Sequence, residues 1–416
     1  METAQPLVTN DAVVLGMLAL ILGFVFYTEA SEHPFWKKFY TYVPGLLLCY
    51  FLPSLLNTFG LVDAEQSRLY FVSSRYLLPT CLVLLTLSID LQAVMRLGYK
   101  AIVMFFTGTI GIMVGGPLAL IIVGMVSPET VGGSGPDAVW RGLTTVAGSW
   151  IGGGANQTAM KEVFEVGDAL FSQMIAVDVI WANVWMAVLL FMAGRAAVLD
   201  ERMGADTTAL VDLRKRVEAF REKHARVLTL TDLMFILAVG FGVTGFAHLT
   251  GTYIAEWIGL NAPVLERMSL TSTFFWLVVI ATTIGIGLSF TRVKNLEGAG
   301  ASRVGTAMLY VLVASIGMGM DIMAVFTNPG LFAIGGIWIA FHAALMLIMA
   351  RVLRVPTFYM AVASQANVGG AASAPVVASA FHPSLAPVGV LLAVLGYGIG
   401  TYAAWICGLV MQAIAT

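Results

Sequence analysis

Residues 101–126 read AIVMFFTGTIGIMVGGPLALIIVGMV and contain no charged side chain. An apolar run of this length can cross a lipid bilayer as a helix, which takes about 20 residues. The rest of the chain is similar, because 59% of the 416 residues are hydrophobic and 11% are charged, with a mean hydropathy of +0.88. A soluble domain has about 25% charged residues. The sequence therefore predicts an all-α polytopic integral membrane protein whose surroundings are the lipid bilayer.

Nine further segments on either side of this run pass the same length test. They are 11–28, 39–59, 69–89, 168–194, 229–250, 271–290, 304–320, 331–350 and 384–412. Two more apolar segments, 141–165 and 357–380, are interrupted by Gly, Ser, Asn, Gln and Pro. The longest polar stretch, Arg195–Arg226, holds eight Lys or Arg and six Asp or Glu. We therefore divide the chain into a first membrane repeat (1–194), a charged cytoplasmic linker (195–228) and a second membrane repeat (229–416).

Basic loops predict the topology, because they stay on the cytoplasmic side. Besides the linker, the basic segments are His33–Lys38, Arg96–Lys100, Arg292–Arg303 and Arg351–Arg354, whereas Ser127–Asp137 has no Lys or Arg and should face outside. Twelve full crossings would put the Arg96–Lys100 loop and the linker on opposite sides. The conflict disappears if 141–165 and 357–380 are re-entrant, which places both termini outside. The alternative is that both cross as broken helices and another segment does not cross.

An internal repeat is indicated by two octets that each close an apolar helix with the same Asp. SIDLQAVM occupies 88–95 and GMDIMAVF occupies 319–326. Each octet is followed by an apolar helix, an interrupted segment with a shared Gly-Gly-Ala (153–155 and 369–371), and one more long helix. If five crossings separate equivalent helices, the two repeats are inverted, which is typical of secondary transporters.

The interrupted segments are the main candidates for a functional site. They read GSWIGGGANQT at 148–158 and SQANVGGAASAP at 364–375. Glycine weakens a helix, and backbone groups freed at membrane depth need partners. Ions or a solute can supply those partners, whereas close packing through small residues is the alternative explanation. The candidate backbone breaks are Gly152, Gly153, Gly154, Gly369 and Gly370, and the candidate ion or substrate ligands are Asn156, Gln157, Thr158, Ser364, Gln365, Asn367 and Ser373.

Asp178 is the second functional signal, because it lies well inside the helix that follows the first break. A carboxylate at that depth costs a few kcal/mol and marks a functional site by default. We interpret Asp178 as an ion-coupling carboxylate that binds Na⁺ or exchanges H⁺, with Asn183 five residues further on; exposure to a water-filled vestibule is the alternative. Asp90 and Asp321 lie at helix ends, where a carboxylate can cap the next helix. His342 is expected to be a satisfied buried histidine.

Other classes of protein lack support in the sequence. A net charge of −2 gives no reason to expect a nucleic-acid partner. Cys49, Cys81 and Cys407 are far apart, which argues against a disulfide framework or a metal cluster. Neither a Gly-x-x-x-x-Gly-Lys loop, nor His-Glu-x-x-His, nor Gly-x-Ser-x-Gly occurs. We therefore expect no enzyme activity and no cofactor, only Na⁺ or H⁺ as a coupling ion.

The Asp-containing octets, the paired Gly-Gly-Ala breaks and the central charged linker resemble the YjcL-like family of uncharacterised membrane proteins, catalogued as domain of unknown function 819. That family is grouped with bile-acid/sodium symporter-like and cation/proton antiporter-like transporters. The resemblance implies two inverted repeats, a core with two crossing discontinuous elements, a scaffold that is often dimeric, elevator-like movement and a bacterial inner-membrane location. The antiporters carry an acidic pair where Asp178 stands, but here Val177 precedes Asp178. Antiport stoichiometry is therefore in doubt.

These observations together predict a secondary active transporter. Na⁺ or H⁺ would bind near Asp178, and a small organic solute, anionic in one interpretation, would bind between the two breaks. An intramembrane enzyme that uses Asp178 as acid or base is one alternative, with His342 as its candidate second titratable group. A passive channel is another, and it predicts a continuous pore. The solute itself cannot be identified from the sequence.

Overall fold

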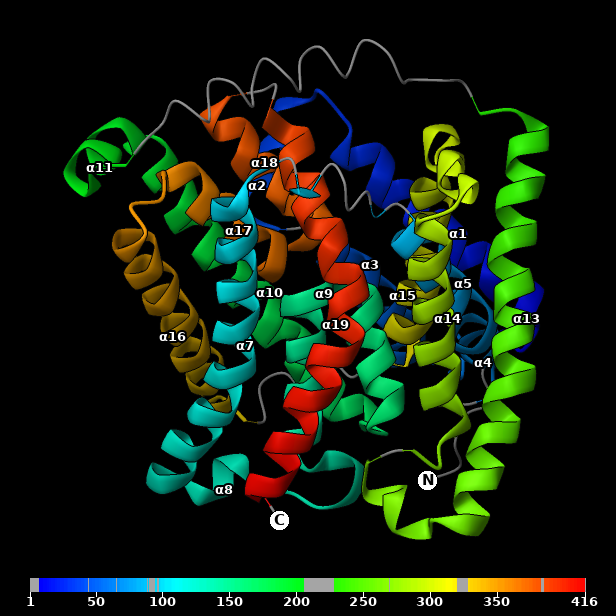
Figure 1. Cartoon of the computed structure of the whole chain (residues 1–416). Coiled ribbons are helices and arrows are strands. Elements are labelled where there is room, and N and C mark those ends of the chain that lie inside the picture. The colour runs from blue at the N-terminus through cyan, green and yellow to red at the C-terminus, as the bar shows by residue number, and fades with distance from the viewer. Residues whose placement is uncertain are drawn as a thin grey trace.

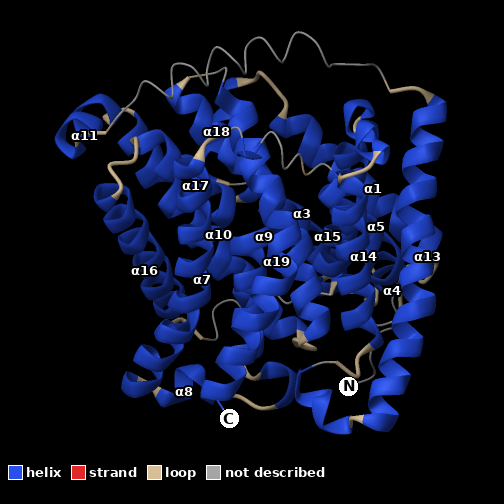
Figure 2. Ribbon diagram, viewed as in Figure 1, coloured by secondary structure: helices blue, strands red, loops and turns tan. Residues whose placement is uncertain are grey.

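The computed structural model describes residues 7–43, 45–64, 66–87, 89, 94–95, 97–205, 228–268, 270–319, 328–382 and 385–415. Throughout these ranges the chain is helical and forms no named strand, apart from an isolated β-bridge between Val8 and Val62 (Figure 2). The all-α prediction is therefore confirmed for this part of the chain. Asp90, Asp321 and residues 206–227 of the linker lie outside the described residues.

The helices of the two halves follow in the order that the apolar segments predict. The first half has α1 (Asp11–Glu29), α2 (Pro34–Tyr42), α3 (Gly45–Thr58), α4 (Leu69–Val72), the π-helical turn η1 (Ser73–Leu77), α5 (Leu78–Leu87), α7 (Tyr99–Val126), α8 (Pro128–Val131), η2 (Gly135–Asp137), α9 (Val139–Val163), α10 (Asp168–Ala193) and α11 (Ala196–Met203). The second half has α13 (Leu230–Asn261), η3 (Pro263–Met268), α14 (Thr273–Ser289), η4 (Arg292–Ala299), α15 (Ala301–Met318), α16 (Gly330–Val352), α17 (Thr357–Val368), α18 (Gly370–Phe381) and α19 (Ala386–Ala415).

Among the described residues, eight helices are long and apolar enough to cross a membrane, and nine if α14 and η4 count as one span. Two of the ten predicted spans differ from expectation. Segment 39–59 is divided between α2 and the 14-residue α3, because the sequence carries a proline at 44 and the residue before a proline disfavours helix. Segment 271–290 forms the 17-residue α14, and η4 follows it at a bend of 94°.

The helices pack into two bundles, which lie on the left and right of Figure 1. The core bundle consists of α7, α9, α10, α16, α17, α18 and α19, and the scaffold bundle consists of α1, α3, α5, α13, α14 and α15. Each bundle takes helices from both halves of the chain. The scaffold therefore comes from the first part of each half and the core from the second part.

The two ends of the molecule differ in composition. α11, the start of the charged linker, lies at one end, and α8 lies with both chain termini at the other (Figure 1). Lys100 donates to the carbonyl of Arg354 at 3.2 Å, so two of the predicted cytoplasmic basic segments are in contact. Asp200 of α11 accepts a bond from Thr357, which places the start of α17 at the linker end as well. The segments Arg96–Lys100 and Arg351–Arg354 thus lie with the start of the linker at the end of the molecule opposite α8.

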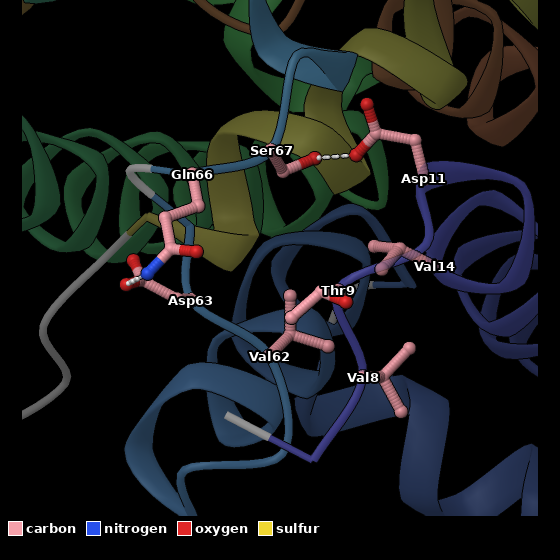
Figure 3. A pocket seen from close by; sticks show the side chains of 8 residues that line it. All are labelled: Val8, Thr9, Asp11, Val14, Val62, Asp63, Gln66 and Ser67. Atoms are coloured by element: carbon pink, nitrogen blue, oxygen red, sulfur yellow. Dashed lines mark hydrogen bonds between the residues drawn. The ribbon is translucent and has the colours of Figure 1, made fainter. Parts of the chain in front are cut away.

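A small surface hollow lies where the N-terminal segment packs on residues 62–67 (Figure 3). Asp11 accepts a bond from Ser67 at 2.8 Å and from the backbone of Arg68 at 3.2 Å, which ties α1 to the start of α4. The hollow includes no residue of the interrupted segments. It explains how the N-terminal segment is held and has no part in the site described next.

Candidate functional site: two helical hairpins and a buried carboxylate

The first interrupted segment, α9, folds back on itself. A straight helix of its 25 residues would be about 37 Å long. Instead, Arg141 at its start donates to the carbonyl of Phe164 at its end, and the rings of Trp140 and Phe164 meet edge to face at 5.9 Å. The reversal occurs at Gly153, whose φ of 74° and ψ of −177° belong to a region that only glycine adopts readily. We call residues 139–163 hairpin 1.

The second interrupted segment, α17 with α18, reverses in the same manner. Phe358 near its start and Phe381 at its end form an edge-to-face pair with ring centroids 5.3 Å apart. The turn lies at Gly369 and Gly370, and Gly370 has a φ of 59°. Gly153 and Gly370 were among the predicted backbone breaks, and both have left-handed φ values. We call residues 357–381 hairpin 2.

The hairpins enter the core from opposite ends and meet at their tips. The base of hairpin 1 joins the η2 loop near α8, where Gly167 donates to the carbonyl of Pro136 at 3.0 Å. The base of hairpin 2 contacts α11 at the far end, through Asp200 (Figure 1). A Cβ added at Gly370 would lie 3.8 Å from the Cα of Gly153. The tips of the two hairpins thus lie next to each other.

Asp178 of α10 binds both arms of hairpin 1 and is only 7% exposed. Its Oδ1 accepts the indole N–H of Trp150 at 2.7 Å. Its Oδ2 accepts the hydroxyl of Ser149 at 2.6 Å and the amide of Gln157 at 2.9 Å. Ser149 and Trp150 precede the break, whereas Gln157 follows it. Hydrogen bonds to an ionised carboxylate are stronger than neutral ones, so Asp178 fixes the hairpin in its folded shape.

Two asparagines bind the hairpin tips to long helices in matching ways. Asn156 of hairpin 1 donates to the carbonyl of Tyr397 at 3.2 Å and accepts the hydroxyl of Thr401 at 2.6 Å, both on α19. It also donates to the carbonyl of Gly152 at 2.9 Å, at the end of the first arm. Its amide is therefore occupied by protein groups in this structure.

Asn367 of hairpin 2 makes the equivalent contacts with α7. It donates to the carbonyl of Phe105 at 3.1 Å and accepts the hydroxyl of Thr109 at 2.8 Å. It donates as well to the carbonyl of Ala363 at 3.0 Å, within its own arm. In each case the carbonyl and the threonine are four residues apart on the partner helix. We call these two arrangements the asparagine clamps.

In hairpin 2, two polar side chains on opposite arms bind each other directly, whereas in hairpin 1 the arms are linked through the carboxylate of Asp178. Gln365 Nε2 donates to the hydroxyl of Ser373 at 2.7 Å. The Oε1 atom of Gln365 is buried and has no hydrogen-bond partner among the described residues. Gly369 leaves the space for this pair, because a Cβ there would lie 2.3 Å from Gln365 Nε2. Unpartnered buried polar atoms are rare, so this acceptor is a candidate ligand atom.

His342 of α16 is fully satisfied. Its Nδ1 lies 3.1 Å from the carbonyl of Gly108, which can only accept, so Nδ1 carries the hydrogen. Its Nε2 pairs with the hydroxyl of Ser364 at 2.7 Å, and that hydroxyl also accepts the indole N–H of Trp185 at 2.7 Å. Ser364, a predicted ligand, is therefore engaged with His342 and Trp185. His342 does not contact Asp178 within the part of the chain described.

A cluster of charged side chains at the base of hairpin 1 was not predicted from the sequence. Arg75 of η1 binds Glu162 at 2.7 Å, which joins the scaffold to the hairpin. The buried Lys161 contacts Asp168 of α10 at 2.9 Å and donates to the hydroxyl of Tyr70 at 2.9 Å, on the scaffold. We call these five residues the base cluster. Its members are too far apart in sequence for their pairing to be read from spacing.

The remaining predicted ligands bond within their own helices. Thr158 donates to the carbonyl of Gly154 at 3.0 Å. Asn183 donates to the carbonyl of Val179 at 2.7 Å, so it makes no bond to Asp178 among the described residues. No group of three or more His, Cys, Asp or Glu that could hold a metal ion occurs in the same ranges. Asp178 with Ser149, Trp150 and Gln157 is thus the most concentrated polar arrangement that the hairpins form.

Comparisons with known proteins identify the family of the chain. Residues 16–414 match the family described as "Protein of unknown function (DUF819)", so the chain belongs to that family. The chain is similar to the "Uncharacterized membrane protein YjcL" of Bacillus subtilis (strain 168), with 22% identity over 382 residues that cover 88% of this chain and 89% of that protein. The predicted family is therefore confirmed, and the protein is an integral membrane protein with several spans.

Proposed function

We propose that this protein is a secondary active transporter that couples movement of Na⁺ or H⁺ to movement of a small organic solute. The observation that carries the proposal is the meeting of Gly153 and Gly370, at the tips of two hairpins that enter from opposite ends. Transporters place binding sites near the bilayer midplane, where discontinuous elements of two inverted repeats meet. The similarity to a membrane protein and the several apolar helices are consistent with this role.

We further propose that both hairpins are re-entrant and that the two halves are inverted repeats. The bases of the hairpins lie at opposite ends of the core, which is what inversion requires. The asparagine clamps support the same conclusion, since Asn156 and Asn367 use the same pattern on α19 and α7. Hairpins, rather than the crossing discontinuous helices that the family resemblance implied, would then form the core. Non-helical backbone at membrane depth is tolerated there because protein buries it.

Alternating access would come from movement of the core bundle against the scaffold bundle, in the elevator manner. Each bundle draws helices from both halves, so each can move as a unit. The base cluster would have to release Arg75 from Glu162 and Tyr70 from Lys161 during that movement. The homodimer and the bacterial inner-membrane location stay predictions.

No specific observation favours an intramembrane enzyme or a passive channel. An intramembrane enzyme needs a second titratable group facing Asp178, but His342 is bound to Gly108 and Ser364. A passive channel needs a continuous pore, whereas the tips of the two hairpins lie so close that a Cβ added at Gly370 would be 3.8 Å from the Cα of Gly153. We therefore propose no catalytic role for Asp178.

Flux measurements on the purified protein in proteoliposomes test the transporter proposal. A panel of small carboxylates and neutral metabolites is added under imposed gradients of H⁺ and of Na⁺, and movement of both ions is recorded with a pH-sensitive dye and radiolabelled Na⁺. We expect one ion to move in exchange or together with one solute class. Ion movement that needs no solute and follows only the membrane potential would support a channel instead.

A further inference from the structure

The atoms that surround Asp178 distinguish a proton site from a metal-ion site. Hard cations bind through oxygen atoms. Two of the three groups on the carboxylate are instead N–H donors, from Trp150 at 2.7 Å and Gln157 at 2.9 Å. The indole of Trp150 has no acceptor atom at all. Both donors direct hydrogen atoms at the position that a cation would occupy, so they oppose a bound Na⁺.

Apart from the unpartnered Oε1 of Gln365 on hairpin 2, the predicted ligand oxygens described below are bound elsewhere. The side-chain oxygens of Asn156 and Asn367 accept threonine hydroxyls of α19 and α7. Gln365 pairs with Ser373, and Thr158 bonds the backbone of its own arm. Among the described residues, Asp178 therefore receives one oxygen partner, the hydroxyl of Ser149. One hydroxyl and two N–H donors thus occupy the carboxylate in this structure.

A proton, by contrast, fits the arrangement without any displaced group. Ser149 lies 2.6 Å from Oδ2, and its hydroxyl can rotate to accept a hydrogen bond from a protonated carboxyl group. Trp150 and Gln157 can keep donating to the remaining lone pairs. Only a hydroxyl hydrogen has to change direction when Asp178 gains or loses its proton.

No cation of a neighbouring element neutralises Asp178 within the described ranges. The titratable groups on elements packed against α10 are Arg141, Lys161 and Glu162 of α9, His342 and Arg351 of α16, Tyr359 of α17, and Asp200, Glu201 and Arg202 of α11. Lys161 and Glu162 belong to the base cluster, and His342 is held by Ser364. From α3 of the scaffold, the buried Tyr50 lies within electrostatic range of Asp178, but it carries no positive charge.

We infer that Asp178 is a proton-binding site, and that the coupling ion of this transporter is H⁺ rather than Na⁺. The inference rests on the proposed transport function and narrows it. Protonation removes the charge that binds Ser149, Trp150 and Gln157 most strongly, and it therefore loosens both arms of hairpin 1 together. Proton binding and the shape of hairpin 1 are coupled through one side chain.

Infrared difference spectroscopy of the reconstituted full chain tests the inference without a known solute, because a protonated carboxyl group has its own C=O stretching band. We expect a pH step to produce a band that is lost in Asp178→Asn and retained in Glu129→Gln, a control carboxylate on the surface helix α8. Exchange of Na⁺ for K⁺ at constant pH should leave the band unchanged. A band that disappears when Na⁺ is added, or no band that depends on Asp178, would overturn the inference.

A second variant keeps the test valid should Asp178→Asn fail to fold. Trp150→Phe retains the carboxylate and removes a donor whose hydrogen bond is stronger to the ionised form than to the protonated form. The midpoint of the pH response should therefore move to higher pH, by about one unit. An unmoved midpoint would contradict the assignment to Asp178.

Flux experiments separate failure of this inference from failure of the proposed function. Solute movement driven by Na⁺ but insensitive to a proton gradient would leave the transporter proposal standing and reject H⁺. Absence of any gradient-driven solute movement, together with an Asp178-dependent carboxyl band, would reject transport and keep the proton site.

Discussion

The two hairpins share a fold but differ in what joins their arms. In hairpin 1, Ser149 and Gln157 lie on opposite arms and both bind the carboxylate of Asp178. In hairpin 2, Gln365 and Ser373 lie on opposite arms and bind each other. A serine and a glutamine therefore link the two arms of each hairpin, but in hairpin 1 they do so through the carboxylate of Asp178. The difference suggests that the repeats provide the shape of the core twice and the ionisable group once.

The largest difference between the hairpins is expected when the carboxylate of Asp178 is removed. Asp178→Leu leaves Trp150, Gln157 and Ser149 as buried donors without an acceptor, at roughly 1–3 kcal/mol each. We expect a loss of several kcal/mol in the free energy of unfolding, measured by denaturant titration in lipid–detergent micelles. Gln365→Leu is the matched change in hairpin 2 and should cost far less. Equal losses would show that the hairpins are held alike.

The turns themselves provide the next test. Gly153→Ala forces a side chain into a backbone conformation that costs about 1–3 kcal/mol. Gly154→Ala is the neighbouring control, because its Cβ would meet only Leu309, at 3.9 Å. We expect a lower unfolding midpoint for the first variant and little change for the second. A similar loss for both would mean that bulk near the tip matters, and not the backbone angle.

The base cluster provides a third test, because it holds the base of hairpin 1 through an ion pair. Arg75→Gln removes the cation from its ion pair with Glu162, whose two side chains are 30% and 10% exposed. The free energy of unfolding should fall by about 1–2 kcal/mol, which lies between the values for exposed and buried ion pairs. Lys37→Gln is the control, since its pair with Glu32 is exposed on both sides and should contribute almost nothing. Proteolysis near residue 75 and thermal unfolding would report the difference.

The smallest expected effects concern the asparagine clamps. Thr401→Val and Thr109→Val each remove a neutral hydrogen bond to an asparagine, worth about 1 kcal/mol. Each also removes one longer contact of 3.3 Å, to Thr282 and to the carbonyl of Phe105 respectively. Because the clamps have the same geometry, the two losses should agree within the error of a thermal unfolding series. A clearly larger loss for one variant would show that the two repeats share a pattern without sharing its energetics.

The spans and the order of elements could be predicted because they depend on local composition. Apolar length located helices at all ten segments, and the proline at 44 explains the one that divides into α2 and α3. The reversal of α9 was anticipated only through the charge of distant loops. Sequence periodicity cannot distinguish a helix that crosses from one that turns back at Gly153, since a single glycine angle decides it.

The site could be predicted in part. Asp178 and the glycine breaks were identified because charge and glycine are unusual at membrane depth. Of the partners of Asp178, Gln157 was among the predicted ligands, whereas Ser149 and Trp150 were not, since they reach Asp178 only after hairpin 1 has folded. Asn156 and Asn367 were expected to bind ions, yet in the structure they bind threonines that lie more than 200 residues away, at separations of 245 and 258 positions. Their role as ligands stays a prediction.

The closeness of Gly153 to Gly370 bears on how fast the interior of the proposed transporter could open. Neither residue has a side chain, so no rotamer change can part the two tips, and one hairpin must move as a body. Rotamer flips take picoseconds to nanoseconds, whereas collective movements of helices take about microseconds to milliseconds. If the proposed transporter opens between the hairpins, the opening would therefore be slow and would occur as discrete events rather than as continuous leakage.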